Sequence, residues 1–505
     1  MGDKSKKVCV IGAGISGLAA IKACLEEGLI PTCYEKLDFV GGMWSDHKKE
    51  KHDNSPTTYP SLVTNISRVN VGFSDFPVPK EWPPYLNRFY VGEYAEMYAE
   101  HFGLKECIRF KTEIVSVTPA KSYDKTGSWL VKVKDLNNDE LSVREFDAVI
   151  VACGVFNRKI KPSVPGLDKD FAGEIFHGGD YKGPENLKDK SILVIGAAFT
   201  GADIACDCAK TAKNVFLSTR NGIWIAPRVS AMGLPIDLIS NRLDLLKKRW
   251  LPSWWTNKNW ANLMESRVNH EACGIKSKYP YMNMLRTITV SDELPLKIYS
   301  GQVKTRPEIK KIAGNTVTYV DGREDFVDTV FVATGYTPYY SFISEEILPS
   351  DFSEARLYKW MFPFQLQHPS TLSFVGILAP GSGGISPNAE MQARYIARVL
   401  SVKKELPSKE QMQKTWTETR EELLQSTGGK FIFRTNHFHY QEDLAQDLGL
   451  VPSFLKLLLT DPRLAYMYYL GPVVPYHYRL VGDHSWDKAR ERSLNIMDEA
   501  LSGMR

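Results

Sequence analysis

The 505-residue chain has no uninterrupted run of about 18 apolar residues, no C-x-x-C cysteine pair and no strong excess of charge. The first absence argues against a membrane-spanning helix. The eight cysteines are dispersed, and runs such as VCVIGAG (8–14) and VIVACGVF (149–156) predict buried thiols in a reducing compartment. Net charge is only +4, from 63 basic and 59 acidic residues, and no basic stripe carries interleaved aromatics. Nucleic acid is therefore not an expected partner.

Signatures of other enzyme classes are missing as well. The chain contains no recognisable Ser-His-Asp signature and no metal-spaced cluster of cysteine and histidine, so no metal site is expected. His437 and His439 form a lone His-x-His pair. Such a pair usually consists of surface or core histidines whose hydrogen bonds are satisfied, and not of metal ligands. The opening MGDKSKKVCVIG leads at once into a strand, which predicts that no cleaved signal peptide precedes the fold. No internal repeat is recognised. Hydrophobic residues make up 43% and charged residues 24%, a globular balance that suits two or three domains or one large α/β enzyme.

The first positive signal is KKVCVIGAGISGLAAIKACLEEG, residues 6–28. A short apolar strand meets a glycine turn and then a helix, the context that dinucleotide binding requires. Gly12 allows the tight turn, Gly14 lets the backbone approach a pyrophosphate, and Gly17 lets the helix pack on the strand. The helix begins near Ile15 and Ser16, where free N–H groups face the phosphates. On that helix, the predicted packing face holds Leu18, Ile21 and Leu25, with Lys22 and Glu26 free to point to solvent.

A second strand follows this helix and ends at Glu35, about 20 residues beyond the loop. A carboxylate at this point can accept a hydrogen bond from a ribose hydroxyl, which suits a nucleotide with a free 2′-hydroxyl such as FAD. The alternative is a glycine-rich turn in some other α/β protein.

A second glycine turn lies in KSILVIGAAFTGADIACDCAK, residues 190–210. Gly196 and Gly201 hold the outer positions, Phe199 and Thr200 precede the last glycine, and Ala198 replaces the middle glycine. The next strand ends in Arg220 rather than an acid. A positive side chain there suits the 2′-phosphate of NADP, with a plain surface arginine as the alternative.

A third landmark is DTVFVATGYTP, residues 328–338, where a buried strand ends in Thr334, Gly335 and Tyr336. The stretch VIVACG (149–154) is similar to it. Both stretches are expected to be crossings of the chain between two nucleotide domains, near the cofactors. A buried strand followed by an ordinary turn is the alternative for each.

These motifs predict an α/β protein with two Rossmann-like dinucleotide-binding domains, one for FAD and one for NADP. Residues 1–155 and 331–445 are expected to form the two segments of the FAD domain, and residues 156–330 the NADP domain. A helical insertion is expected at about 225–290, which is rich in Trp, Lys and Met. It either covers the active site, touches a membrane through its aromatics and lysines, or packs on the protein as ordinary helices. Residues 446–505 are expected to form a helical tail.

The stretch FAGEIFHGGDY, residues 171–181, carries the pattern F-x-G-x-x-x-H-x-x-x-Y between the two loops. Phe171, Gly173, His177 and Tyr181 fill its fixed positions. With this pattern, GGMW (41–44), LVTNISRVNVGFSDFP (62–77) and ATGY (333–336), the chain resembles the animal flavin-containing monooxygenases, over nearly its whole length. The related Baeyer–Villiger enzymes usually carry Trp where this chain has Tyr181.

The resemblance implies an NADPH- and O₂-dependent enzyme that oxygenates amines, sulfides and related small molecules, xenobiotics among them, with N-oxides as one class of product. NADPH would reduce FAD, whose C4a-hydroperoxide would oxygenate the substrate while NADP⁺ stays bound. Gly42 and Trp44 match the flavin-binding GGMW segment, and Asn65, in TNIS, matches the active-site asparagine, which donates hydrogen bonds near the flavin. An asparagine in an ordinary turn is the alternative for Asn65. His177 is expected to link the two domains rather than to act as an acid or base.

Some features depart from the family. Ala198 stands where a glycine is usual, Asn221 gives Arg220 no basic neighbour, and the apolar membrane tail of animal members is missing. A naturally soluble protein and a shortened chain both stay open. Location in the cytoplasm or on the cytosolic face of the endoplasmic reticulum fits, with peripheral membrane contact and homo-oligomers left open.

Three other functions compete with this one. A Baeyer–Villiger monooxygenase would use the same scaffold on ketones, and an NADPH oxidase-like flavoprotein sensor would pass electrons to O₂ only. A flavin disulfide oxidoreductase would need a redox-active cysteine pair, which the sequence does not contain.

Overall fold

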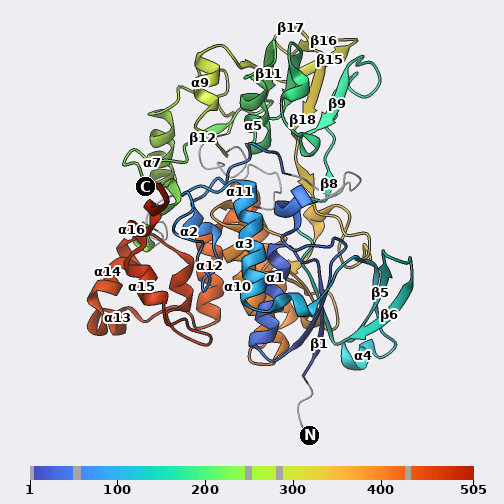
Figure 1. The fold of residues 1–505 in the computed structure, drawn as a ribbon, viewed down its shortest axis with the longest axis vertical. Coiled ribbons are helices and arrows are strands. Elements are labelled where there is room, and N and C mark those ends of the chain that lie inside the picture. Colours follow the sequence, from blue (N-terminus) through green and yellow to red (C-terminus); the bar gives the residue numbers. More distant parts are fainter. Residues whose placement is uncertain (1–4, 49–57, 245–252, 280–287, 427–433, 505) are drawn as a thin grey trace.

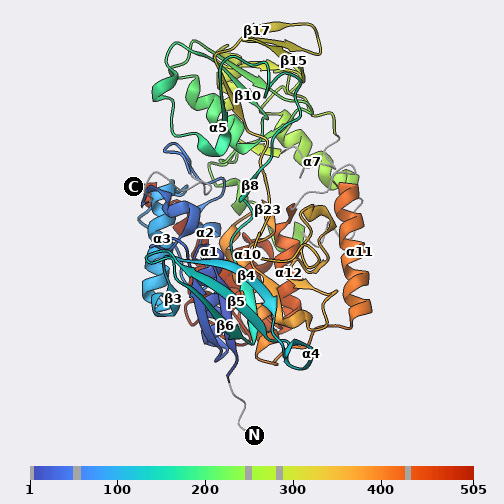
Figure 2. The ribbon, with the colours of Figure 1, turned by 90° about the vertical axis from the view of Figure 1, so that its right-hand side faces the viewer.

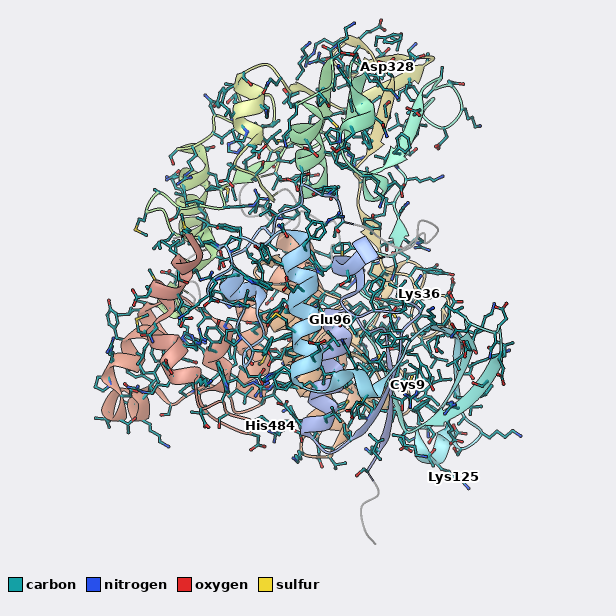
Figure 3. All side chains as sticks on the ribbon, viewed as in Figure 1. Cys9, Lys36, Glu96, Lys125, Asp328 and His484 are labelled. Atoms are coloured by element: carbon teal, nitrogen blue, oxygen red, sulfur yellow. The ribbon has the colours of Figure 1, made fainter. Side chains whose placement is uncertain are left out.

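The computed structural model describes residues 5–48, 58–244, 253–279, 288–426 and 434–504. Two five-stranded parallel sheets form the centres of two halves of the molecule (Figure 1). Cys9, on a strand of the first sheet, and Asp328, just before a strand of the second, mark how far apart the sheets lie (Figure 3). The predicted α/β class with parallel sheets is confirmed.

The first sheet has the strand order β22-β7-β1-β2-β3. The central strands β1 and β7 contain continuous apolar runs because both of their faces are buried. Helix α1 joins β1 to β2, helix α3 precedes β3, and a three-stranded antiparallel sheet leads into β7. The elements are β1 (Lys7–Ile11), α1 (Ile15–Glu26), β2 (Ile30–Tyr34), α3 (Arg88–His101), β3 (Ile108–Arg109), β4 (Thr112–Pro119), β5 (Trp129–Asp135), β6 (Leu141–Phe146), β7 (Ala148–Val151) and β22 (Leu372–Phe374).

The second sheet has the order β14-β11-β10-β18-β9. It repeats the first plan: a strand, a helix, a second strand, a third strand, an antiparallel three-stranded sheet and a returning strand. The elements are β9 (Glu174–His177), β10 (Ser191–Ile195), α5 (Phe199–Cys208), β11 (Asn214–Ser218), α9 (Leu294–Tyr299), β14 (Lys304–Arg306), β15 (Ile309–Ala313), β16 (Thr316–Tyr319), β17 (Glu324–Phe326) and β18 (Thr329–Val332). β18 straddles the domain boundary predicted after residue 330. The two halves share this plan although no repeat is recognised in the sequence, because the same topology needs only a similar pattern of buried positions.

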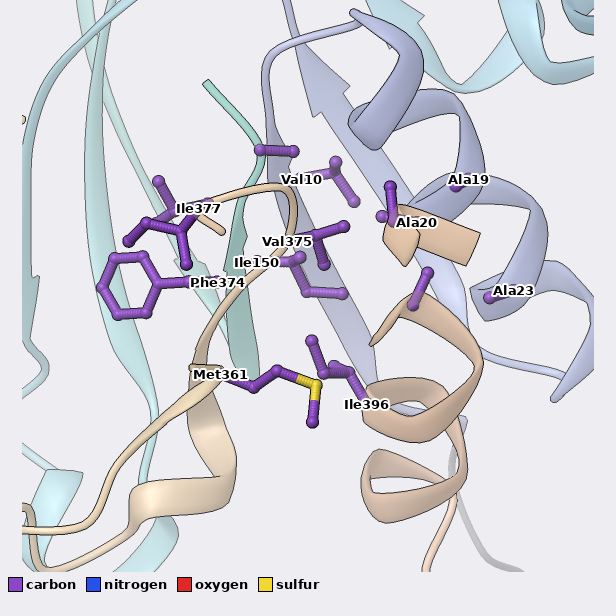
Figure 4. Packing of buried hydrophobic residues seen from close by; sticks show 14 of the residues in the cluster. Val10, Ala19, Ala20, Ala23, Ile150, Met361, Phe374, Val375, Ile377 and Ile396 are labelled. Carbon is purple, nitrogen blue, oxygen red and sulfur yellow. The ribbon is translucent and has the colours of Figure 1, made fainter. Parts of the chain in front are cut away.

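Helix α1 is buried on more sides than a surface helix. Helix α10 (Ile385–Leu400) packs against it, and Ala19, Ala20 and Ala23 keep the two helices close above Val10 of β1 (Figure 4). The expected solvent face is therefore wrong. Lys22 is only 5% exposed and pairs with Glu26 (Nζ–Oε1 2.5 Å) and Asp75 (Nζ–Oδ2 2.7 Å), whereas Leu25 is 42% exposed. Cys153 is also exposed rather than buried as predicted, because β7 ends at Val151 and Cys153 already lies in the irregular segment that follows it.

The chain crosses between the two halves twice, and the crossings pair with each other. β8 (Arg158–Lys159) runs antiparallel to β19 (Tyr336–Thr337), with Tyr336 opposite Lys159. Figure 2 shows β8 between the two halves.

Within the second half, β12 (Trp224–Ala226) pairs with β13 (Ile288–Val290), and the predicted insertion lies between them. Its described part contains a short 3₁₀ turn (Ile236–Leu238) and α7 (Ser253–Glu265), and Asn241 bridges to Pro472 near the C-terminus. Further helices are α2 (Arg68–Val71), α4 (Tyr123–Thr126) and α11 (Lys409–Ser426), and further strand pairs are β20 (Leu357–Tyr358) with β21 (Phe362–Pro363) and β23 (Ala379–Ser382) with β24 (Arg434–Asn436).

The C-terminal part is helical and packs beside α12 (Figure 1). It is anchored by Arg479, which is 1% exposed and binds Glu390 of α10 (2.7 Å) and Asp75 (2.8 Å). Among the described helices, none is long and apolar enough to cross a membrane. The elements are α12 (His437–Asp447), α13 (Phe454–Thr460), α14 (Pro462–Leu470), a 3₁₀ turn (Pro475–Arg479), α15 (Ala489–Leu494) and α16 (Ile496–Ala500).

Candidate functional site

The first glycine loop is a tight turn at the carboxyl end of β1. Gly12 has φ +95°, a conformation that favours glycine, and a Cβ on Gly17 would lie 1.8 Å from the carbonyl oxygen of Gly12. The start of α1 is therefore pressed directly onto the turn. Gly376 is similarly close to Ser16, since its Cβ would lie 2.0 Å from that hydroxyl. These contacts fix the direction of α1.

Gly14 has a different role from Gly12 and Gly17, because its surroundings leave room for a Cβ. It is the N-cap of α1, with φ −71° and ψ −175°, and carries no side-chain cap. A Cβ on Gly14 would meet only Gly42, whose Cα would lie 3.7 Å away. The N–H groups of Ile15, Ser16 and Gly17, in the first turn of α1, have no intrahelical acceptor. The backbones of Gly14 and Gly42, neither of which carries a side chain, thus face each other beside the free N–H groups of α1. This arrangement fits the binding of a pyrophosphate.

Gly42 begins the 3₁₀ turn Gly42–Lys48, which also contains Trp44. The turn is held against α3, because Gly92 leaves room for the Trp44 carbonyl: a Cβ there would lie 2.8 Å from that oxygen. The ring of Trp44 packs, partly buried, on the first core.

Glu35 lies beside the first loop, as its position after β2 predicts. Its carboxylate is 7% exposed and accepts from the N–H of Ala13 (2.7 Å) and of Leu37 (2.9 Å). These bonds orient the carboxylate at the end of the sheet, and ribose binding remains a prediction.

The second loop copies the first in backbone geometry. Gly196 has φ +103°, and a Cβ on Gly201 would lie 1.9 Å from the carbonyl oxygen of Gly196. Ala198 is the N-cap of α5, with φ −72° and ψ −177°, within 2° of each angle of Gly14. Alanine adopts this conformation without strain, and Ala198 is exposed, so the missing glycine leaves the loop intact. Phe199 and Thr200 form the first turn of α5 with its free N–H groups.

Arg220 follows β11 and is exposed, with no partner for its guanidinium among the described residues. The fold brings the backbone of a second basic residue to the next position. The N–H of Lys278 donates to the carbonyl of Asn221 (2.8 Å), so the backbone of Lys278 lies beside the residue that follows Arg220, although 58 positions separate Lys278 from Arg220 along the chain. Binding of an NADP 2′-phosphate at Arg220 stays a prediction.

Thr334, Gly335 and Tyr336 lie at the crossing between the halves. The Thr334 hydroxyl donates to the carbonyl of Ile160 (2.6 Å), and the N–H of Ile160 donates to the carbonyl of Gly335 (3.0 Å). These hydrogen bonds hold the two crossing segments together. Contact of Thr334, Gly335 and Tyr336 with a cofactor stays a prediction.

His177 is bound to this crossing. Its Nδ1 accepts from the N–H of Gly179 (3.1 Å), so Nε2 carries the proton and donates to the carbonyl of Gly335 (3.2 Å). The ring also meets Tyr336 edge-on at 4.9 Å between centroids. Burial lowers the pKa of His177, which favours the neutral ring that this pattern needs. These contacts support a linking role.

The other positions of the motif are structural too. Gly173 has no room for a side chain, since a Cβ would lie 2.2 Å from the carbonyl oxygen of Asp328. The hydroxyl of Tyr181, which is 2% exposed, donates to Asp207 of α5 (2.8 Å). Asp207 also accepts from Ser61 of the first half (3.0 Å), so one carboxylate joins the two halves. Burial raises its pKa, but the hydrogen bonds from Lys210, Tyr181 and Ser61 outweigh this, and the pKa lies below its ordinary value.

Asn65 lies half-buried on the segment between the first loop region and α2, where the first half meets the insertion. Its Oδ1 accepts a hydrogen bond from Arg228 Nη2 (2.8 Å), 163 positions away. The neighbouring Thr64 donates its N–H to the carbonyl of Leu86 (2.8 Å). Sequence reasoning missed Arg228, and nothing local to either residue signals the pair.

The residues thus divide into a set around the first loop, predicted to bind FAD, a set around the second loop, predicted to bind NADP, and a third set at the crossing. The geometry of both loops fits a dinucleotide, because in each the helix begins without a side-chain cap and the last glycine has no room for a Cβ. Within the described part of the chain, no group of three or more His, Cys, Asp or Glu side chains is arranged to hold a metal ion. His437 is buried against Asn388 (3.1 Å).

Comparison with known proteins agrees with this geometry. A family model described as flavin-binding monooxygenase-like matches residues 5–505. The chain is 37% identical to flavin-containing monooxygenase 5 of Oryctolagus cuniculus over 499 residues, covering 98% of this chain and 92% of that one. It is 35% identical to dimethylaniline monooxygenase (N-oxide-forming) 2 of Mus musculus, covering 99% and 93%.

Solved structures show the same fold. An S-allyl-L-cysteine S-oxygenase from Allium sativum matches with a TM-score of 0.67 and 22% identity, covering 98% of this chain and 99% of that one. A cyclohexanone monooxygenase from Rhodococcus bound to NADP⁺ matches with a TM-score of 0.61 and 17% identity, covering 88% and 98%.

Proposed function

Because the chain belongs to the flavin-containing monooxygenase family, NADPH-dependent flavoprotein oxidoreductases that use FAD, we propose that it transfers one oxygen atom of O₂ to a nitrogen or sulfur atom of a small molecule. Bound FAD would supply the hydride-transfer and O₂ chemistry that the side chains lack. The chain binds the two nucleotides, aligns them, excludes water and donates hydrogen bonds.

The observation that carries this proposal is the pair of matching loops at the carboxyl ends of two separate sheets. The first loop, with Glu35 and Gly42, would hold FAD in a domain formed by residues 1–155 and 331–445. The second, with Arg220, would hold NADPH in the domain at 156–330. The paired crossings β8 and β19 connect the domains, and Asn65 would donate its amide N–H at the reaction centre.

The names of the similar proteins guide the choice of substrate. One names N-oxide formation, and another names S-oxygenation of a small amino acid thioether. A tertiary amine and a thioether are therefore the first substrates to test. Oxygen insertion beside a ketone is the competing activity on this fold.

One assay separates the alternatives. The FAD-loaded protein is mixed with NADPH and air, and NADPH loss, hydrogen peroxide and oxygenated product are followed for a thioether, a tertiary amine and a cyclic ketone. We expect sulfoxide or N-oxide in proportion to NADPH consumed. Lactone as the main product would favour the Baeyer–Villiger reaction, and peroxide with no product from any substrate would favour the oxidase-like sensor.

We further propose that the enzyme works in the cytoplasm or at the cytosolic face of the endoplasmic reticulum, where its eight unpaired cysteines stay reduced. Cell fractionation with a tagged chain tests this. Recovery from a secreted or lumenal fraction would contradict it.

A further inference from the structure

Arg228 joins the insertion to the loop that carries Asn65. It lies two residues after β12, and its side chain is 16% exposed. Its Nη2 donates to Asn65 Oδ1 (2.8 Å), and its Nε donates to the carbonyl of Thr64 (3.2 Å). One guanidinium thus holds two consecutive residues of the loop.

Arg228 is itself held in place from several directions. Its backbone N–H donates to Asp292 Oδ1 (3.0 Å), and its Nη1 lies 3.4 Å from Asp292 Oδ2. The hydroxyl of Tyr85 donates to its carbonyl oxygen. Tyr85 directly precedes Leu86, whose carbonyl binds the N–H of Thr64, so Arg228 and the loop share one framework.

The chemistry of the pair decides which way the Asn65 amide faces. A guanidinium has five N–H donors and no acceptor, so the amide atom that faces it must be the oxygen. The amide nitrogen then points away from Arg228. Within the described residues, Nδ2 of Asn65 has no hydrogen-bond partner, whereas Oδ1 has this charged one. An amide without such a neighbour turns over readily, exchanging its donor for its acceptor.

A second group of the insertion holds the other side of Asn65. Asp237, in the 3₁₀ turn Ile236–Leu238, accepts from the backbone N–H (3.1 Å) and hydroxyl (2.6 Å) of Ser67 and from Nδ2 of Asn70 (2.8 Å). The insertion therefore grips the chain both at and after Asn65. These hydrogen bonds tie the loop to the insertion on both sides of Asn65 along the chain.

From this arrangement we propose that Arg228 is a positioning residue that keeps the Asn65 amide turned with its N–H donor toward the reaction centre. The proposal rests on the role assigned to Asn65 in the proposed function. It also gives the insertion a definite role, because the insertion then sets the donor direction at the flavin site of the other domain. Asp237 secures the backbone on which this direction depends.

The test compares Arg228→Met and Asn65→Ala, singly and together, with Arg267→Met as matched control. Arg267 belongs to the same insertion and donates to the carbonyl of Val229 (3.0 Å), next to Arg228, but among the described residues it makes no hydrogen bond to the Asn65 loop. Four quantities are measured: oxygenated product per NADPH consumed, the anaerobic rate of flavin reduction, the visible absorption and circular dichroism of bound oxidised FAD, and the thermal midpoint.

We expect Arg228→Met and Asn65→Ala each to lower product per NADPH roughly tenfold, since each removes the effect of one charge-oriented hydrogen bond. Flavin reduction should stay near wild type in both, and their FAD spectra should change in the same direction. Adding Arg228→Met to Asn65→Ala should change nothing further, because both act through one amide. Arg267→Met should match wild type.

The outcomes separate the two proposals. If Asn65→Ala keeps full product per NADPH, the role of Asn65 in the proposed function fails. If Asn65→Ala uncouples but Arg228→Met does not, or if the double variant loses much more than either single one, the positioning role of Arg228 fails. Should Arg228→Met not fold, Arg228→Lys serves. The compact ammonium on a flexible stem lacks the rigid planar fork that directs separate N–H groups at the two oxygens, so intermediate coupling is expected, and full coupling would contradict the proposal.

Discussion

Replacing Gly14 by alanine should weaken FAD binding while leaving the folded apoprotein intact. The backbone at Gly14, φ −71° and ψ −175°, is open to alanine. The new Cβ would lie 3.7 Å from Gly42 Cα and 3.9 Å from Gly42 N, which is ordinary contact. An alanine N-cap costs a few tenths to about 1 kcal/mol relative to glycine, and the lower entropy of the unfolded chain returns about 0.4–1 kcal/mol. The net change in apoprotein stability should therefore lie within about 1 kcal/mol.

The unfavourable effect of the new methyl group on binding free energy appears only when FAD binds. The methyl group occupies the gap between Gly14 and Gly42, through which a phosphate would reach the free N–H groups of α1. Losing one charged hydrogen bond costs about 1.5–3 kcal/mol, so FAD should bind roughly tenfold to a hundredfold more weakly. Titrating deflavinated protein with FAD, by quenching of flavin fluorescence, measures this, and calorimetry of the apoprotein measures the stability.

The second loop supplies the matched control. Ala198→Gly makes the reverse change in the same backbone conformation, and it should leave FAD affinity unchanged while NADPH binds equally or more tightly. The reasoning fails if Gly14→Ala binds FAD as tightly as wild type. It fails equally if Ala198→Gly loses FAD to the same degree.

Three further changes follow from the same structure. Gly17→Ala places a Cβ 1.8 Å from the Gly12 carbonyl oxygen and should cost about 3 kcal/mol or more of stability, so a thermal midpoint equal to that of wild type would contradict the packing argument. Arg220→Met should raise the KM for NADPH roughly tenfold with little change in the KM for NADH, and Lys278→Met should have the same effect more weakly. Steady-state kinetics with NADPH and with NADH measures both KM values. An equal rise in the two KM values would contradict the assignment of the 2′-phosphate to Arg220. His177→Ala should impair NADPH use or coupling while FAD stays bound, and loss of oxygenation with full NADPH affinity and coupling would count against the linking role.

The pH dependence of His177 has a definite sign. Its pKa in the folded protein is lowered by burial, so its contribution to stability is fully present above its ordinary pKa of about 6.5 and is lost as the pH falls toward the folded pKa. In His177→Ala this part of the acid sensitivity should disappear. Unfolding midpoints measured between about pH 5 and pH 8 show whether it does.

The dinucleotide loops could be predicted because their geometry is local. Gly12 and Gly17 meet within one turn, and Gly196 and Gly201 meet in the same way, so the need for glycine is contained in a few consecutive residues. The strand before each loop and the helix after it are equally local, since they follow from runs of apolar residues.

Other features depended on which distant parts of the chain the fold packs against a given element. Lys22 is buried rather than exposed because Asp75 and α10 cover its face of α1, which the helical pattern alone does not contain. The common plan of the two halves escaped detection because topology constrains which positions are buried and leaves the residue types free.

The sequence by itself determined two nucleotide-binding units, their order along the chain and the glycine positions on which each depends. Only the tertiary structure decided how those units are joined and aimed: Tyr181 and Ser61 meeting on Asp207, and Arg228 meeting Asn65 across 163 positions. The physical reason is that a glycine turn is made by short-range sterics, whereas a hydrogen bond between distant residues exists only after packing has brought donor and acceptor within about 3 Å.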